Sequence, residues 1–532
     1  MIDLELPLEL SAESPAFASA NGARAWLAQL PLTNAQRAQA VLAHQMQLLI
    51  GKSLVIEDRL GIVEVLRESV LFLQQESQRR CAGRPLPLLA AERASYEASL
   101  DLWRALETNY LLCLQQGIAE QRTDLVALAA QRALAAKTGE LLAHAVGGFV
   151  VSGSFWCRLH QIYRAAESAQ VTLRTVVDTA RQNPATTVAT AYVEPLLLAA
   201  AQPLELSHRQ IELVANWAWR WAAKVSVLTS LPRDARTPPL PVDLSGAAAL
   251  APADGAEAGS DTRWLEVSDL RKSLKLRLRA LEQGETPEIL QLGSDCAPAA
   301  GAELLQRVYR LWCRHGADPV QVLRPETSCE LVSGATAIYF CISGSAFSQP
   351  DPGSRMSKRE IEEIATFGGI IERHREADGR QMAPELWRSR AVGASELQLR
   401  RSLEQAGARL CRSQLVAIRV AEQDDFMLAV VRVLAVDAQV ASLDASLRLL
   451  PGTPSAVALR CTGLGPGADS FVPGFRLPGL EHLREPASVL MPSTYFRPGR
   501  IIEILSDRLR QIRLTQLLER GSDFERAAFD WE

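Results

Sequence analysis

Five arginines near the middle of the chain are the residues whose type and spacing best suit ligand chemistry. They are Arg373, Arg375, Arg380, Arg388 and Arg390. A guanidinium can hold a phosphate through two parallel hydrogen bonds and can stack on a planar base. Residues 371–413 contain nine Arg against six Asp or Glu, a local excess of three positive charges. This segment is a candidate anion site, and equally an ordinary surface of an arginine-rich protein.

The overall composition explains why that alternative stays open. Of 57 basic residues only six are lysines, so arginine is common throughout the chain. The formal net charge of the 532 residues is -4, which excludes a globally basic nucleic-acid binder. We therefore expect no nucleic-acid partner.

Signatures of catalysis are missing. The seven histidines show no H-E-x-x-H spacing, and the chain has no phosphate-binding loop of the G-x-x-x-x-G-K-[ST] type and no G-x-S-x-G nucleophile turn. The nine cysteines are widely spaced without a C-x-x-C pair, so we expect no metal site and no disulfide framework. His160 follows Phe155 and Trp156 and is expected to be structural. The sequence predicts that the protein is not an enzyme.

Three tryptophans form a candidate interface. Ser207 and Gln210 make a capping-box pair that opens a helix. The same helix carries Trp217, Trp219 and Trp221, whose spacing prevents all three from sharing one face. At least one should point toward another domain or a protein partner, because tryptophans are frequent interface anchors.

Residues 1–228 are expected to form an all-α interaction domain. Apolar residues recur every three or four positions in several runs, which places them on single helix faces, as at Leu60, Val63, Leu66, Val70 and Leu73. No strict repeat period is present. An irregular helical bundle or solenoid fits this pattern.

The rest of the chain is expected to be mixed and then β-rich. Residues 229–262 are rich in Pro, Ala and Gly and predict a boundary, with a short strand at 240–244. Residues 263–370 predict a mixed α/β segment, with helices at 270–281 and 302–314, a β-prone stretch at 329–343, and a capping box at Ser357 and Glu360.

Residues 371–532 are expected to form a β-rich domain, and from about residue 385 to residue 460 the hydrophobic period switches to two. Strands are predicted at 397–399, 414–420, 426–436, 442–450, 455–460 and 501–505. Short strands with tight turns favour an antiparallel barrel with a C-terminal extension. The fold class is thus multidomain α+β. The N-terminus lacks the features of a signal peptide and no apolar run is long enough to span a membrane, so we expect a cytoplasmic protein.

One family resemblance covers much of the chain. It rests on CELVSGATAIYFCISGSAFSQP, IATFGG, ELW, the run from LVAIRV to AVALR, and FRPGR. These segments resemble a PilZ domain, the small β-barrel with which bacteria bind cyclic di-GMP, in PilZ-related proteins with a helical N-terminal half. The resemblance implies a dinucleotide site made by an R-x-x-x-R arm and a D-x-S-x-x-G turn.

This chain departs from the PilZ pattern at every marked position of the turn. Ala391 stands in place of the Asp, Gly393 in place of the Ser and Glu396 in place of the Gly. A glutamate beside a diphosphate repels it. No arginine pair in the segment has the R-x-x-x-R spacing of the arm.

The resemblance leaves two functions open. The first is a non-catalytic regulatory or scaffold protein, whose degenerate PilZ-like domain acts through protein contacts in a cyclic di-GMP-linked pathway. The alternative is a genuine cyclic di-GMP receptor with an atypical site built from the five arginines. An enzyme without a recognisable motif is a third. The sequence names neither the protein partner nor the oligomeric state, and it implies no cofactor other than cyclic di-GMP.

Overall fold

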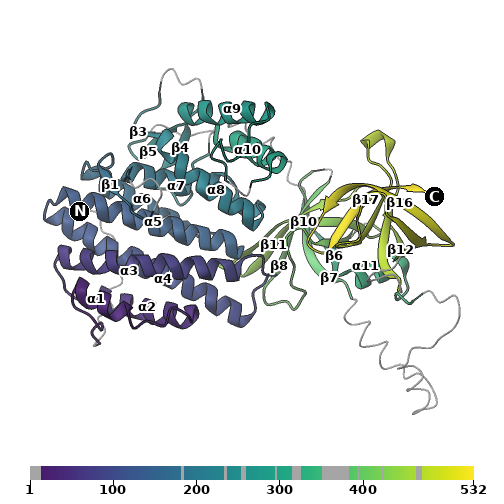
Figure 1. The fold of residues 1–532 in the computed structure, drawn as a ribbon, viewed down its shortest axis with the longest axis horizontal. Helices are drawn as coiled ribbons and strands as arrows, with labels where there is room; N and C mark the ends of the chain where they lie inside the picture. The colour runs from purple at the N-terminus through teal and green to yellow at the C-terminus, as the bar shows by residue number, and fades with distance from the viewer. Residues whose placement is uncertain are drawn as a thin grey trace, which may run out of the picture. The chain divides into compact units, whose positions relative to one another are not determined.

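The computed structural model describes residues 13–180, 185–232, 237–252, 259–293, 296–313, 325–349, 383–393, 395–421, 423–462 and 470–532. The chain divides into two compact units, residues 1–84 with 88–319 and residues 85–87 with 320–532. The first unit is mainly helical and the second mainly β (Figure 1). A helical N-terminal half followed by a β-barrel part is therefore confirmed.

The helices of the first unit are α1 (Ala20–Leu27), α2 (Ala35–Ile50), α3 (Ile56–Cys81), α4 (Ala90–Ala119), α5 (Thr123–Gly147), α6 (Gly153–Ser168), α7 (Val188–Ala200), α8 (His208–Trp221), α9 (Ser268–Glu282) and α10 (Pro298–Cys313). Its 3-10 turns are η1 (Pro203–Glu205) and η2 (Ala222–Lys224). Its strands are β1 (Thr175–Val177), β2 (Ala185–Thr187), β3 (Ser226–Leu228), β4 (Leu240–Asp243) and β5 (Thr262–Glu266). The predicted helices at 270–281 and 302–314 are confirmed, and so is the strand near 240.

Helix α5 lies at the centre of the helical unit. It packs along α4 and also contacts α3, α6, α7 and α8. Many of its residues are alanines, which allow the neighbouring helices to approach closely. Because α5 is covered on most sides, its polar residues are buried as well, among them Gln131, Arg132, Lys137 and Glu140. Buried polar groups need partners, so the position of α5 dictates polar networks inside this unit.

One face of α6 holds the small three-stranded sheet β3-β5-β4. Positions 153, 157, 160, 164 and 167 follow helical spacing and lie on one face. Cys157 Sγ contacts the Gly246 carbonyl at 3.5 Å, and Arg164 pairs with Asp261 at 3.1 Å. Glu167 accepts two hydrogen bonds from Arg263. The Pro/Ala/Gly-rich boundary is thereby attached to the helical unit.

The second unit contains two closed antiparallel barrels and one helix. The first barrel has the strand order β10-β11-β8-β7-β6-β9 and the second β12-β13-β14-β17-β16-β15. The strands of the first barrel are β6 (Thr327–Ser333), β7 (Glu385–Ala391), β8 (Glu396–Ser402), β9 (Leu415–Val420), β10 (Met427–Asp437) and β11 (Ser442–Leu449). Those of the second are β12 (Ser455–Cys461), β13 (Val472–Leu477), β14 (Ser488–Pro492), β15 (Ile501–Leu505), β16 (Leu509–Arg520) and β17 (Phe524–Trp531), with the 3-10 turn η3 (Glu481–Leu483).

This architecture differs from the single barrel predicted after residue 371. All six predicted strands of residues 371–532 are present, but β12 and β15 belong to a second barrel. The first barrel also takes β6 from the segment that was expected to be mixed. The β-prone stretch at 329–343 is only half strand: Gly334 adopts φ 88°, and the next residues form α11 (Ala335–Ser343). The capping box at Ser357 and Glu360 and the segment IATFGG lie outside the described residues.

Helix α11 joins the two barrels through a shared apolar core. Its buried residue Ile338 belongs to the same cluster as Leu415 and Leu428 of the first barrel and Phe475 and Leu490 of the second. The second barrel has a further core of its own, built from alternate residues of β12 and β14–β17. Because α11 contributes to a core that neither barrel completes alone, the two barrels form one unit.

Candidate functional site

Two of the five candidate ligand arginines are described, and both lie on β7. Trp387 and Ser389 are buried inside the first barrel. Arg388 and Arg390 alternate with them along β7, so their side chains lie on the outer face. Arg390 pairs with Glu326 at 3.1 Å. Arg388 is exposed and has no ion-pair or hydrogen-bond partner among the described residues. Arg373, Arg375 and Arg380 lie outside the described residues.

A further arginine faces Arg388 across the neighbouring strand. Arg400 of β8 is its cross-strand partner in the register, and both side chains are exposed. Asp444 of β11 holds Arg400 through two hydrogen bonds of 2.8 and 2.9 Å. Carboxylates thus neutralise Arg390 and Arg400, and of the described arginines on the outer faces of β7 and β8 only Arg388 has no carboxylate partner.

The three altered turn positions supply no group that favours a phosphate. Ala391 ends β7, Gly393 lies in the turn with open space around it, and Glu396 begins β8 with its side chain exposed. Strand alternation places Glu396 on the outer face, while the next residue, Leu397, is buried. Glu396 therefore does not fill the space beside Trp387. It places a negative charge on the same outer face as Arg388.

Trp387 is sealed inside the barrel. It is 1% exposed, and the Arg401 guanidinium lies 4.8 Å from its ring centre. Arg401 is itself buried and pairs with Glu385, whose carboxylate also accepts from the backbone N–H of Ala408. Each charge has a partner, as burial requires. The tryptophan of the ELW segment is thus part of the barrel interior, where an external ligand does not meet it.

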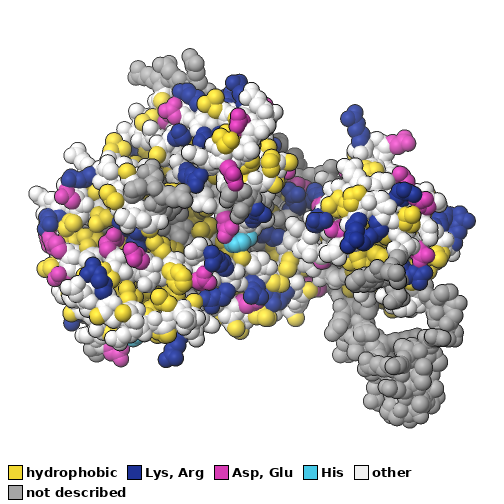
Figure 2. Space-filling view, viewed as in Figure 1, with side chains coloured by type: hydrophobic (Ala, Val, Ile, Leu, Met, Phe, Trp, Pro, Cys, Tyr) yellow, Lys and Arg dark blue, Asp and Glu magenta, His cyan; other side chains and the backbone are white. Residues whose placement is uncertain are grey.

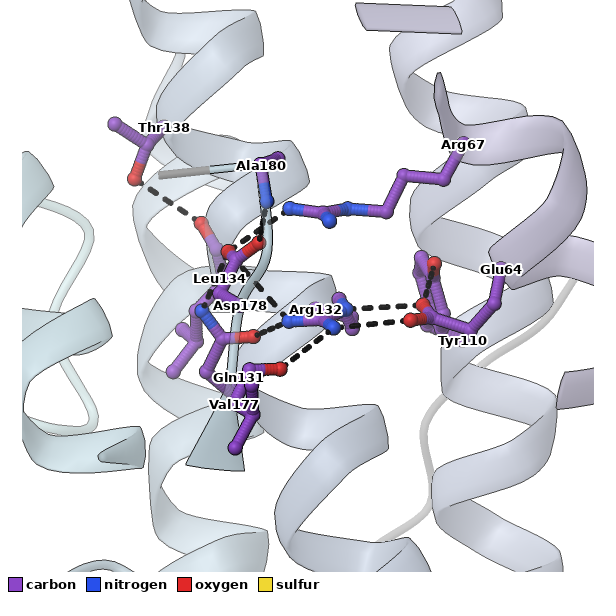
Figure 3. A network of polar contacts seen from close by, with 10 residues as sticks. All are labelled: Glu64, Arg67, Tyr110, Gln131, Arg132, Leu134, Thr138, Val177, Asp178 and Ala180. Carbon is purple, nitrogen blue, oxygen red and sulfur yellow. Dashed lines mark hydrogen bonds and ion pairs between the residues drawn. The ribbon is translucent and has the colours of Figure 1, made fainter. Parts of the chain in front are cut away.

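The helical unit holds a buried ionic network that the sequence did not reveal (Figure 3). Arg132 of α5 donates to both carboxylate oxygens of Glu64 of α3 at 2.9 Å, and Tyr110 of α4 donates to the same carboxylate. Asp178, in the loop after β1, pairs with Arg67 of α3 at 2.9 Å and lies 3.5 Å from Arg132. Two arginines and two carboxylates give the network a net charge of zero.

The network fixes the protonation of Glu64. Burial alone would raise the pKa of this carboxyl, but the hydrogen bonds and charge of Arg132 outweigh it, so the pKa is lowered. The carboxylate is therefore ionised at neutral pH and ties α3 to α5.

A cavity of about 360 Å³ adjoins this network. Polar residues from four helices line it: Arg67 from α3, Arg132 and Thr138 from α5, Glu194 from α7, and Asn216 from α8. The Trp103 ring of α4 forms part of the wall and takes the place that a Cβ of Gly139 would occupy. Residue 139 must be glycine for α4 and α5 to pack as they do, because a Cβ there would clash with Trp103. The cavity is a polar, aromatic-walled hollow inside the helical unit.

A second buried cluster lies between α4 and α5. Lys137 donates to Glu140 at 2.6 Å, and Arg104 donates to the same carboxylate at 2.8 Å. Burial raises the pKa of Glu107, which lies 4.0 Å from Lys137. Lys137 also lies 3.8 Å from the ring centre of Phe155. These charged groups pair with one another, and the cluster has the character of a structural network.

His160 is structural, as expected from the sequence. Its two ring nitrogens lie 2.7 Å from the Tyr192 hydroxyl and 2.8 Å from the Ala248 carbonyl. Because the carbonyl can only accept, the nitrogen facing it carries the proton and the tyrosine hydroxyl donates to the other. Burial lowers the pKa of His160, which keeps the ring neutral.

The structure removes two of the three tryptophans from the candidate interface. Trp217 and Trp221 are each 1% exposed and stack with ring centres 5.6 Å apart. Trp312 of α10 packs edge-on against Trp221. Their i, i+4 spacing turns both toward the core, so neither can anchor an external partner. Trp219 lies on another face and is half-buried.

The described residues form no metal site, and charges of both signs are mixed on the face of the molecule that Figure 2 shows. Over the described ranges, no group of three or more His, Cys, Asp or Glu residues is arranged to hold a metal ion. Figure 2 shows basic and acidic side chains interspersed over the visible face. Among the residues that the structure describes, every helix is too short or too polar to span a lipid bilayer.

Comparisons with known proteins identify similarity at both ends of the chain. Residues 21–233 match the model for the N-terminal domain of the cyclic-di-GMP receptor FimW, and residues 457–531 match the model for the FimW C-terminal beta-barrel domain. The cyclic-di-GMP receptor FimW of Pseudomonas aeruginosa is 27% identical over 206 residues, which cover 38% of this chain and 34% of that protein. The match thus spans about a third of the relative's length. No solved structure matches the chain.

The two matches coincide with structural parts. The first covers α1 to α8, and the second covers most of the second barrel. The first barrel, Thr327 to Leu449, lies between them. Neither model supports or contradicts the PilZ resemblance of the first barrel, which stays a prediction.

Proposed function

We propose that this chain is a non-catalytic regulatory protein of a cyclic di-GMP-linked pathway, in which the turn between β7 and β8 does not hold the dinucleotide. The observation that carries the link is the similarity of both the helical domain and the second barrel to domains of a cyclic-di-GMP receptor. No catalytic family is indicated. The widely spaced, free cysteines suit a cytoplasmic protein.

The geometry of the first barrel supports the second part of the proposal. A dinucleotide with two phosphates requires several available cations, and Arg388 is the one described arginine of β7 and the facing strand β8 whose charge is not paired with a carboxylate. Ala391 and Gly393 bring no polar side chain to the turn. The first barrel then acts as a scaffold whose outer face binds a protein partner.

A second candidate is a receptor that binds cyclic di-GMP itself. The Pseudomonas aeruginosa relative is a cyclic-di-GMP receptor, which favours this candidate, as does the guanidinium of Arg388, which has no partner among the described residues. In that case Arg388 and the other candidate arginines supply the phosphate contacts.

Restoring the turn tests whether it is a degenerate PilZ site. The triple variant Ala391→Asp, Gly393→Ser, Glu396→Gly regains the ligand groups and removes a negative charge from the outer face. We expect it to bind cyclic di-GMP more tightly than the natural chain in calorimetric titration. A variant with an outward substitution elsewhere on β8, Gln398→Ser, is the control. A folded triple variant that gains no affinity contradicts the PilZ-like interpretation of the turn.

A further inference from the structure

We infer that one rim of the second barrel, which carries Arg476, Arg510 and Trp531, binds a nucleotide through its phosphate. The inference rests on the second candidate above, in which the chain itself meets a nucleotide, but it assigns a site on a different barrel from the β7–β8 turn. Three features carry it: two arginines without carboxylate partners at one rim, an exposed tryptophan beside one of them, and acidic neighbours that leave the two charges in place.

The residues concerned lie at the same end of the barrel. Ser455 begins β12, Arg476 is next to last in β13, Arg510 is second in β16, and Trp531 ends β17. Neighbouring strands of this barrel are all antiparallel, so strand starts alternate with strand ends around each rim. Six strands spaced ~4.8 Å apart and tilted by ~40° enclose a ring roughly 12 Å across. Side chains on this rim can therefore reach one small ligand together.

The register places these side chains above the core of the barrel. Cross-strand partners point to the same face of a sheet. Val489, Ile504 and Ile512 point inward, because they belong to the apolar core that the second barrel has of its own. They are the register partners of Arg476, Arg510 and Trp531, respectively. The two arginines and the tryptophan thus lie at the mouth of the barrel, a common position for ligand sites.

Both arginines have hydrogen-bond donors to offer. Arg510 is exposed and Arg476 is half-buried, and neither pairs with a carboxylate among the described residues. Arg476 donates from Nε to Ser455 Oγ at 3.4 Å, which leaves its two terminal nitrogens for a ligand. A guanidinium holds a phosphate through two parallel hydrogen bonds, and two guanidinium groups match the charge of a phosphate monoester.

Trp531 gives the rim an aromatic surface. It is 46% exposed, and the Arg510 guanidinium lies 5.0 Å from its ring centre. Phe529 packs edge-on against it with ring centres 5.3 Å apart, which fixes its orientation. An arginine over a ring keeps its N–H groups, which lie in the guanidinium plane, free for a phosphate. Because a base can stack on an exposed aromatic ring, the rim suits a nucleotide better than inorganic phosphate.

The acidic groups near this rim do not cancel the charges of Arg476 and Arg510. Asp530 and Glu532 lie on the outer face beside Arg513, which pairs with Glu532. In the strand connections that meet this rim, each acidic residue has an arginine paired with it or close to it in the chain: Asp507 with Arg508, Glu481 with Arg484, and Glu485 with Arg526. The mouth of the barrel therefore keeps an excess of positive charge, which suits an anion.

The test uses the full-length chain and guanosine monophosphate in calorimetric titration, with ribose 5-phosphate and guanosine as comparison ligands. We expect the nucleotide to bind, and each of the two fragments to bind more weakly by about tenfold or more. Ribose 5-phosphate that binds as tightly as the nucleotide, or a nucleotide that gives no heat at millimolar concentration, overturns the inference.

Arginine variants locate the binding at this rim. The double variant Arg476→Gln, Arg510→Gln should weaken the nucleotide by about tenfold or more. Arg497→Gln is the matched control and should leave binding unchanged. Arg497 is exposed and without a carboxylate partner among the described residues, but it lies at the opposite rim, between β14 and β15. A double variant that is folded by circular dichroism and binds like the natural chain, or a control that weakens binding equally, overturns the site.

A tryptophan variant separates the base from the phosphate. Trp531→Leu should weaken guanosine monophosphate and leave ribose 5-phosphate unchanged, because only the nucleotide has a base to stack. A general loss of stability would not produce this difference between the two ligands. An equal loss for both ligands overturns the placement of the base on Trp531.

The same variants separate this inference from the proposed function. Cyclic di-GMP binding that falls in the double variant Arg476→Gln, Arg510→Gln and is unchanged by Arg388→Ala supports the rim. Cyclic di-GMP binding that is lost with Arg388→Ala and unchanged in the double variant overturns the rim and leaves the receptor function standing.

Discussion

The Arg401 guanidinium lies 4.8 Å from the centre of the Trp387 ring inside the first barrel. This contact decides the role of the tryptophan that precedes the altered turn, because a ring covered by a buried cation is unavailable to a ligand outside. Among the described arginines of β7 and β8, Arg388 is the one whose charge is not paired with a carboxylate. The described parts of β7 and β8 therefore offer a ligand fewer unpaired guanidinium groups than their number of arginines indicates.

Removing Arg401 should destabilise the first barrel. Arg401→Ala leaves the Glu385 carboxylate without its cation and uncovers Trp387, and breaking a buried ion pair costs about 3–5 kcal/mol. Hydrogen exchange of peptides from β7 and β8 measures the local opening free energy. The neighbouring variant Arg400→Ala, whose side chain is exposed, should cost about 1 kcal/mol or less. Equal effects of the two variants contradict this account of the barrel interior.

The ionic network of Figure 3 should be essential to the helical unit. Asp178→Asn removes the charge that partners Arg67, and both side chains are at least nine-tenths buried, so a loss of about 3–5 kcal/mol is expected. Urea unfolding measures the change. Asp124→Asn is the matched control, because Asp124 pairs with Arg174 at the surface and is 75% exposed. If the control destabilises as much as Asp178→Asn, the network is not the cause.

We expect the free energy of unfolding to decrease in mild acid because of the buried His160. Burial lowers the pKa of the folded histidine, so the unfolded chain takes up the proton more readily. The contribution of His160 is intact above about pH 6.5, the ordinary pKa of histidine, and is lost as the pH falls below it. The unfolding free energy should differ less between pH 7.5 and pH 5.5 for His160→Gln than for the natural chain. The control His44→Gln, at an exposed position, should show the same difference in unfolding free energy as the natural chain. If His160→Gln also shows that full difference, the result would falsify the role given to His160.

The tryptophans of α8 should divide into two classes. Trp217→Ala removes a fully buried ring and should cost about 3–5 kcal/mol of unfolding free energy. Trp219→Ala, at a half-buried position, should lower the unfolding free energy clearly less. If α8 contacts a protein partner, Trp219→Ala should be the variant that weakens this contact. Urea unfolding of both variants provides the comparison. A larger loss for Trp219→Ala would reverse the placement of the two rings.

Local signals in the sequence predicted the elements well. The capping box at Ser207 and Gln210 opens α8, with the serine side chain accepting from the Gln210 N–H. Buried and exposed residues alternate regularly in β8, whereas β9 and β10 are buried over most of their length and were predicted as apolar, β-prone runs. The alternating pattern did not predict how the strands divide, since closure into two barrels depends on pairings between distant strands such as β12 with β15.

The candidate site was less predictable for a physical reason. The choice between a free and a paired arginine depends on residues far along the chain, such as Asp444 for Arg400. Asp178 lies 111 residues from Arg67, and nothing in its local sequence signals that contact. The alanines around Arg132, Lys137 and Glu140 were the one available sign, because charged residues on an alanine-rich helix at the centre of a bundle must find partners inside it.

The central claim is that the β7–β8 turn does not hold cyclic di-GMP. The most direct measurement is calorimetric titration of cyclic di-GMP into the full-length chain and into the double variant Arg388→Ala, Arg390→Ala. The account predicts the same titration curve for both proteins, because among the described arginines of β7 and β8 only Arg388 has no carboxylate partner, and one guanidinium is too little for a ligand with two phosphates. Binding to the natural chain tighter than ~10 µM that is abolished in a folded double variant would contradict it.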